Sequence, residues 1–135
     1  MKVAMIINKD LPVGLIANAS AVLGISLGRL FPEIVGADIM DATGSMHTGI
    51  TAKTIPILGA SLDQVKSIRD KLFTEAYEDI VVVDFSEIAQ KCLDYENYTT
   101  LLSNVERSEI YYLGICLCGS MKKVNGLTGN LGLLR

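Results

Sequence analysis

The sequence predicts a single α/β domain, a three-layer or two-layer sandwich built on a mixed β-sheet. Its length of 135 residues suits one hydrophobic core. Near-continuous apolar runs at residues 3–8 and 80–83 are typical of strands that are covered on both faces. Segments with helical periodicity separate these runs, and alternating strands and helices favour a layered architecture.

The first half of the chain is expected to hold three strands and one long helix. Residues 3–8 form the first strand, and Pro12 marks the start of a helix that ends near residue 30, because proline suits the first helical position. The helix is rich in small side chains, which favour close packing on a sheet or on a partner helix. Residues 34–40 and 50–58 are predicted as short strands that flank a loop.

The second half begins with a helix that the sequence marks clearly. Ser61 and Gln64 form a capping box, and an apolar stripe follows at helical spacing. The next apolar run, at 80–83, ends in Asp84. The remaining predicted elements are a helix at 85–104 broken near 94–97, a strand at 108–118, a short helix at 120–125 and a terminal strand at 131–134.

The charge balance disfavours a nucleic-acid partner. The chain has 12 basic and 15 acidic residues, a net charge of −3 and a pI of about 5.1. A protein that grips a phosphate backbone needs several positive side chains on one face, and Lys122 and Lys123 are the only basic pair. We therefore treat tRNA as an alternative partner that the acidic charge opposes.

The three cysteines predict reduced thiols in a cytoplasmic protein, since an odd number cannot all pair. We expect Cys116 and Cys118 on opposite faces of their strand. None of the three has metal-ligand spacing with His47, so neither a metal site nor a cofactor is expected. No run of about 18 apolar residues is free of breaks, so we expect no membrane span.

Two motifs near the C-terminus carry a family resemblance. They are Tyr112-Leu113-Gly114-Ile115 and Leu127-Thr128-Gly129-Asn130-Leu131-Gly132-Leu133-Leu134. They resemble the closing segment of type-2 peptidyl-tRNA hydrolases, in which a histidine stands at the position of Asn130 and a lysine at that of Gly132. The resemblance implies a type-2 peptidyl-tRNA hydrolase-like fold over residues 1–135.

The N-terminal half departs further from that family. Asp10-Leu11 matches its pattern, but two loop residues and both lysines are missing, and Leu15 stands about where a functional lysine would be. Asp84 matches an aspartate that the family uses in catalysis. With additional segments at 38–49 and 91–106, the chain is similar to an uncharacterised group often labelled domain of unknown function 2000.

The candidate site residues are polar groups in loops and at strand ends. Asp10 and Asp84 lie at strand-to-helix junctions, where ligands bind in α/β sheets, although an aspartate there often only caps a helix. His47 is the only histidine and a candidate general acid or base, although a lone loop histidine is usually just solvated. Asn8, Gly14 and Thr48 complete the candidate ligand-binding set.

Three functional hypotheses follow. The leading one is a diverged member of the fold that binds a small polar or anionic ligand in a pocket formed by Asn8, Asp10, Gly14, His47 and Asp84. The second is a hydrolase of peptidyl-tRNA or another acyl ester, with Asp84 as acid/base partner and water as nucleophile. The third is a structural or interaction module. A homodimer is expected, because the helices carry more apolar residues than one small sheet readily covers.

Overall fold

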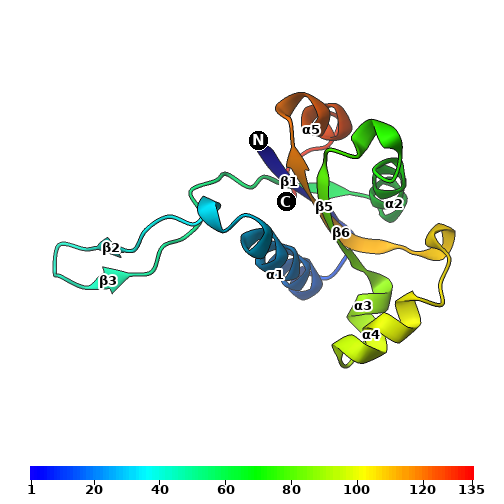
Figure 1. The fold of residues 1–135 in the computed structure, drawn as a ribbon, viewed down its shortest axis with the longest axis horizontal. Coiled ribbons are helices and arrows are strands. Elements are labelled where there is room, and N and C mark those ends of the chain that lie inside the picture. Colours follow the sequence, from blue (N-terminus) through cyan, green and yellow to red (C-terminus); the bar gives the residue numbers. More distant parts are fainter.

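The computed structural model describes residues 1–135, and its centre is a four-stranded mixed sheet with the order β4-β1-β6-β5 (Figure 1). The strands are β1 Lys2–Asn8, β4 Ile57–Ala60, β5 Val81–Ser86 and β6 Tyr112–Gly119. β1 pairs in parallel with β4, whereas β6 is antiparallel to both β1 and β5. The carboxyl ends of β1, β4 and β5 therefore meet at one edge of the sheet.

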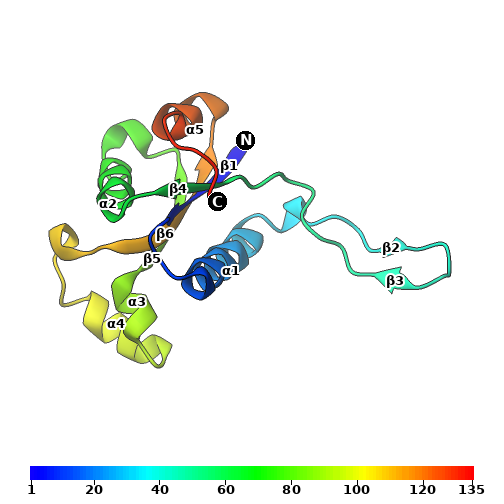
Figure 2. The same cartoon turned by 180° about the vertical axis from the view of Figure 1, so that it is seen from behind.

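Helices cover both faces of this sheet, so the predicted α/β class and mixed sheet are confirmed and the arrangement has three layers. Helix α1 (Val13–Leu30) lies on one face, and α2 (Leu62–Lys71) and α5 (Met121–Thr128) lie on the other (Figure 2). Each face has its own buried cluster, of 12 residues under α2 and α5 and of 11 under α1. Strand β6 contributes to both clusters, because its side chains alternate between the faces.

Local signals located the first two helices well. Pro12 is the residue before α1 and makes no side-chain cap. The capping box of α2 is present: Gln64 donates its backbone N–H to Ser61 Oγ at 3.2 Å, and Ser61 donates its own to Gln64 Oε1 at 2.9 Å. Together these bonds satisfy two backbone donors that the helix itself leaves unpaired.

The segment after β5 is two short helices, as the expected break indicates. They are α3 (Glu87–Lys91) and α4 (Tyr95–Leu102). Ser86 accepts the Ala89 N–H at the start of α3, and Asp94 accepts the Asn97 N–H at the start of α4. Asp84 therefore caps no helix, because β5 extends two residues beyond it.

Residues 35–52 form a two-stranded hairpin that projects from the body, which we call the arm (Figures 1 and 2). Its strands are β2 (Ile39–Met40) and β3 (Met46–His47), which pair only with each other. The predicted strands at 34–40 and 50–58 were therefore mostly wrong. Pairing with the main sheet begins at the Pro56 carbonyl oxygen, which accepts the Met5 N–H at 2.9 Å, and continues in β4; Pro56 itself has no N–H to donate to a ladder.

The two C-terminal motifs have clear structural roles. A Cβ added at Gly114 would lie 2.5 Å from Ile7 Cδ1 and 3.2 Å from the Ile6 carbonyl oxygen, so a larger residue there would require Ile7 to move where β6 pairs with β1. The terminal residues run beside β4: Gly59 donates to the Gly132 carbonyl oxygen at 3.0 Å, and Leu134 donates to that of Ile57 at 2.9 Å. The predicted terminal strand is thus reduced to one bridge that covers the β4 edge.

The cysteine pair corrects one expectation. Cys116 and Cys118 both lie in the cluster under α1, because residues two apart in a strand point to the same face. All three cysteines are free thiols. A hydrogen bond with Cys118, followed by burial, raises the pKa of the Cys116 thiol well above its usual range.

Helix α1 alone is long and apolar enough to meet the criteria for a membrane span. One such helix is weak evidence for a span, since core helices and signal sequences meet the same criteria; three of the 18 residues of α1, Ala19, Leu23 and Leu27, are buried against the sheet.

Candidate functional site

Asp84 lies on β5, an edge strand, close to the carboxyl edge of the sheet. Its Oδ2 accepts a hydrogen bond from Arg69 Nε of α2 at 2.7 Å. The Arg69 side chain is 12% exposed and that of Asp84 25%, so this ion pair is largely shielded from water. Ligands bind at the carboxyl edges of strands in open α/β sheets, which makes the surroundings of Asp84 the first place to search.

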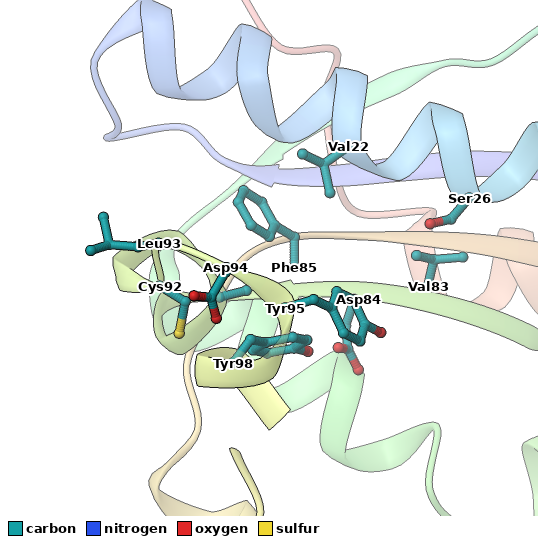
Figure 3. A pocket seen from close by; sticks show the side chains of 11 residues that line it. Val22, Ser26, Val83, Asp84, Phe85, Cys92, Leu93, Asp94, Tyr95 and Tyr98 are labelled. Atoms are coloured by element: carbon teal, nitrogen blue, oxygen red, sulfur yellow. The ribbon is translucent and has the colours of Figure 1, made fainter. Parts of the chain in front are cut away.

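A groove of about 390 Å³ lies between α1 and the α3–α4 segment, with Asp84 at its border (Figure 3). Val22 and Ser26 line it from α1, opposite Tyr98 of α4 (Figure 3). Its lining is mostly hydrophobic and contains two carboxylates but no lysine or arginine. The full lining is Val22, Ser26, Val83, Asp84, Phe85, Ala89, Cys92, Leu93, Asp94, Tyr95 and Tyr98.

A second cavity of about 250 Å³ also has Asp84 in its wall. Its polar lining includes Ser86, Arg107 and Tyr112. Tyr112 is 2% exposed, and burial, followed by the charge of Asp84, raises the pKa of its hydroxyl to about 12. Tyr112 is therefore a neutral hydrogen-bonding group at physiological pH.

Arginine side chains form the wall beside this cavity. The guanidinium groups of Arg69 and Arg107 lie 3.7 and 4.6 Å from the centre of the Phe73 ring. Such stacking on an aromatic face fixes the planar guanidinium of Arg69 while its Nε donates to Asp84. The orientation of the Asp84 carboxylate is therefore set by α2 and Phe73.

Tyr98 connects the groove to the Asp84 end of the sheet. Partial burial, followed by the negative charge of Asp84, raises the pKa of the Tyr98 hydroxyl, and a hydrogen bond with Ser86 opposes that rise. The Tyr95 ring packs edge-on against Tyr98, with 5.5 Å between ring centres. Two tyrosine rings and a carboxylate thus border one apolar groove.

The structure separates most of the predicted ligand-binding residues from this groove. Asn8 ends β1 and is buried, and its Oδ1 accepts the Asp10 backbone N–H at 3.0 Å. Asn8 shares the carboxyl edge with Asp84, but β6 lies between their strands. Asp10 and Gly14 are exposed in the turn and the first turn of α1. None of these three lines either cavity that contains Asp84.

His47 and Thr48 lie on the arm, away from Asp84 in both views of the molecule (Figures 1 and 2). His47 Nε2 lies 2.7 Å from Asp41 Oδ2, and Asp41 Oδ1 accepts the backbone N–H groups of Thr43 and Ser45. His47 therefore participates in the turn of the arm. The shared pocket expected from the sequence does not form.

Sequence reasoning missed three residues around Asp84. Arg69, Tyr98 and Tyr112 come from three elements that are distant in the chain. The tyrosines of the added segment at 91–106 were a usable signal, because tyrosine combines apolar area with a polar group in ligand pockets. Arg69 had no comparable sequence signal, since a basic residue in the last turn of a helix is usually solvated.

Comparisons with known proteins agree with the fold and name no activity. The chain resembles the solved structure of a protein of unknown function from Agrobacterium tumefaciens strain C58, with a TM-score of 0.87 and 20% identity over 98% of this chain and 96% of that chain. No curated protein matches the sequence. The family model described as protein of unknown function (DUF2000) matches residues 1–135. The chain therefore belongs to the DUF2000 family.

Proposed function

We propose that this protein binds a small organic ligand in the groove beside Asp84, and that the ligand is largely apolar or aromatic with a positively charged or hydrogen-bond-donating group. The observation that carries the proposal is the composition of the groove, which is mostly apolar, aromatic on one side and bordered by carboxylates. Concave apolar sites with a few convergent polar groups are the usual form of ligand sites.

The charged residues near the groove determine which ligand charge it favours. Asp84 and Asp94 are both in its lining, and the nearest guanidinium, that of Arg69, is already bonded to Asp84. An anionic ligand in the groove would meet two carboxylates in a lining that contains no lysine or arginine, which is unfavourable in a half-buried site. The sequence suggested a small polar or anionic ligand; the lining of the groove favours a cationic or hydrogen-bond-donating ligand over an anionic one.

A matched pair of probes tests this proposal. We expect phenethylamine to shift the amide NMR signals of groove residues at millimolar concentration, and 3-phenylpropanoate, which has a similar shape and the opposite charge, to shift them much less. Ser26→Trp fills the groove from α1 and should abolish the shifts. Ser67→Trp, on the exposed surface of α2, is the control and should leave them unchanged.

The results separate the possible outcomes. Equal shifts by both probes would disprove the charge preference, and shifts that survive in Ser26→Trp would place binding elsewhere. No shift with any member of a broader set of aromatic amines, alcohols and amides would disprove the proposal itself.

Hydrolysis of peptidyl-tRNA or another acyl ester is the second candidate, favoured by the presence of Asp84 at an accessible carboxyl edge. Against it, Arg69 holds the carboxylate, and the net charge is −3. Cleavage of labelled peptidyl-tRNA by the wild-type protein, lost in Asp84→Asn, would support it. Equal turnover by the two proteins, or none by either, would exclude this role of Asp84.

The third candidate, an interaction module, is favoured by the separation of His47 from Asp84. The arm contributes nothing to the groove, so its sequence has to be explained by another role.

A further inference from the structure

The arm exposes more apolar surface than a hairpin in water readily supports. All residues from 35 to 48 are exposed, and five large hydrophobic side chains are exposed by 47% to 79%. They are Val35, Ile39, Met40, Met46 and Ile50. An isolated two-stranded hairpin is only marginally stable, so a surface that covers these side chains would stabilise it.

The arm is nevertheless well bonded internally. Asp38 Oδ1 accepts the Gly49 N–H at 2.8 Å, the Gly36 N–H donates to the Ile50 carbonyl oxygen at 2.9 Å, and Asp41 bonds the turn. A Cβ on Gly49 would lie 1.8 Å from the Gly36 carbonyl oxygen, so the two sides of the arm are in close contact at its base. These hydrogen bonds hold the base and the turn of the arm together, whereas its large apolar side chains are exposed.

Helix α1 has an exposed surface of matching character. Val13, Ala17, Ala21 and Ile25 are spaced by four residues, so they lie along one face of the helix, and all four are exposed. Val13 is 81% exposed and Ile25 76%. No charged residue occurs between 13 and 28, whereas the outer face of a solvated helix is normally charged. The small side chains of the two alanines leave a shallow depression, the saddle, between Val13 and Ile25.

We infer that the arm of one molecule packs on this α1 stripe of a second copy, and that a two-fold symmetric dimer contains two such contacts. The arm cannot reach its own stripe, because it leaves the body beyond the C-terminal end of α1 and points away from it (Figures 1 and 2). An isologous dimer satisfies both surfaces at once. Methionines suit the saddle, because their unbranched side chains adapt to irregular surfaces.

The area involved reaches that of a small standard interface. In the register of β2 and β3, Met40, Met46 and Ile50 share one face of the arm and Val35 and Ile39 the other, so one contact buries three of the five side chains. Six such side chains in two contacts remove about 600 Å² from water and the receiving surfaces lose a similar area, which gives a total of about 1,200 Å², at the lower end of the standard interface size. The stripe and the ligand groove use different sides of α1, since Val22 and Ser26 line the groove. This inference is therefore independent of the proposed function.

Complementation between two variants tests the contact. One variant carries Ile39→Glu and Met46→Glu, which place a charge on each face of the arm, and the other carries Ile25→Glu on the stripe. All three positions are exposed, so both proteins should fold with melting temperatures close to that of the wild type. Light scattering should give twice the chain mass for the wild type at micromolar concentration and the single chain mass for each variant.

Mixing the two variants is the decisive step. A mixed dimer has one intact arm on one intact stripe, so we expect dimer to reappear, with an affinity between those of the wild type and the separate variants. A monomeric wild type, or variants that dimerise like the wild type, would overturn the inference. A mixture that stays monomeric would show that the arm does not dock on the stripe. Flotation of a monomeric wild type with phosphatidylcholine vesicles would identify a lipid surface as the occupant instead.

Discussion

The ion pair between Arg69 and Asp84 should stabilise the fold measurably, because it is largely removed from water. Its atoms are 2.7 Å apart, and its side chains are 12% and 25% exposed. Exposed ion pairs contribute about 0 to 1 kcal/mol, and breaking a fully buried pair costs about 3 to 5 kcal/mol. For this intermediate burial we expect a coupling free energy of about 2 kcal/mol.

A double-mutant cycle measures that coupling. The variants are Asp84→Asn, Arg69→Met and the two combined, each unfolded with urea at 25 °C. The cycle cancels the loss of Arg69 stacking on Phe73, because that loss occurs in both arginine variants. The Lys123–Asp79 pair is the control, since its atoms are also 2.7 Å apart but its side chains are 38% and 56% exposed.

The comparison between the two ion pairs tests whether burial determines the coupling free energy. We expect the control coupling to fall within the error of the measurement. If the Arg69–Asp84 coupling were no larger than that of the control, burial would not determine its strength. Arg69 of α2 would then not hold the Asp84 carboxylate in place.

Two further predictions concern the arm. Gly49→Ala should open its base, because the new Cβ would lie 1.8 Å from the Gly36 carbonyl oxygen, whereas Gly132→Ala has nothing within 4 Å. Amide hydrogen exchange should increase across 36–50 in the first variant only; unchanged protection would contradict the close approach. Hydrogen bonds, first from His47 and then from backbone amides, hold the pKa of Asp41 below 3.8. The ionised Asp41 carboxylate therefore stabilises the turn at pH values above its ordinary pKa of 3.8. This contribution is lost as the pH falls through the lowered pKa of the folded protein. Amide exchange at 43 and 45, corrected for its intrinsic pH dependence, should rise there, and Asp41→Asn should remove the transition.

The candidate site could be located from the sequence only in part. Asp84 was identified because it follows a buried apolar run, and the carboxyl ends of strands are where α/β proteins bind ligands. The other expected members were chosen from the end of the first strand, the start of the first helix and the loop that contains His47. Sequence gives no information on which loops meet, and His47 and Thr48 belong to a hairpin that leaves the body.

The sequence alone determined the elements whose signals are local. The apolar runs of β1 and β5, the capping box of α2 and the break between α3 and α4 depend on neighbours within a few residues, so they can be read directly. The α/β class follows from their alternation.

Only the tertiary structure decided what surrounds Asp84 and what becomes of residues 34–58. Arg69 meets Asp84 because α2 packs on β6 and β1, on the sheet face to which the Asp84 side chain points. Tyr98 comes from α4, which follows β5 in the chain. Residues 50–56 were expected to lengthen β4, but Ile57 already pairs with Met5 and β1 begins at Lys2, so most of them lie beyond the start of β1. Strand pairing and side-chain contact depend on which segments become neighbours in space, and no short stretch of sequence contains that information.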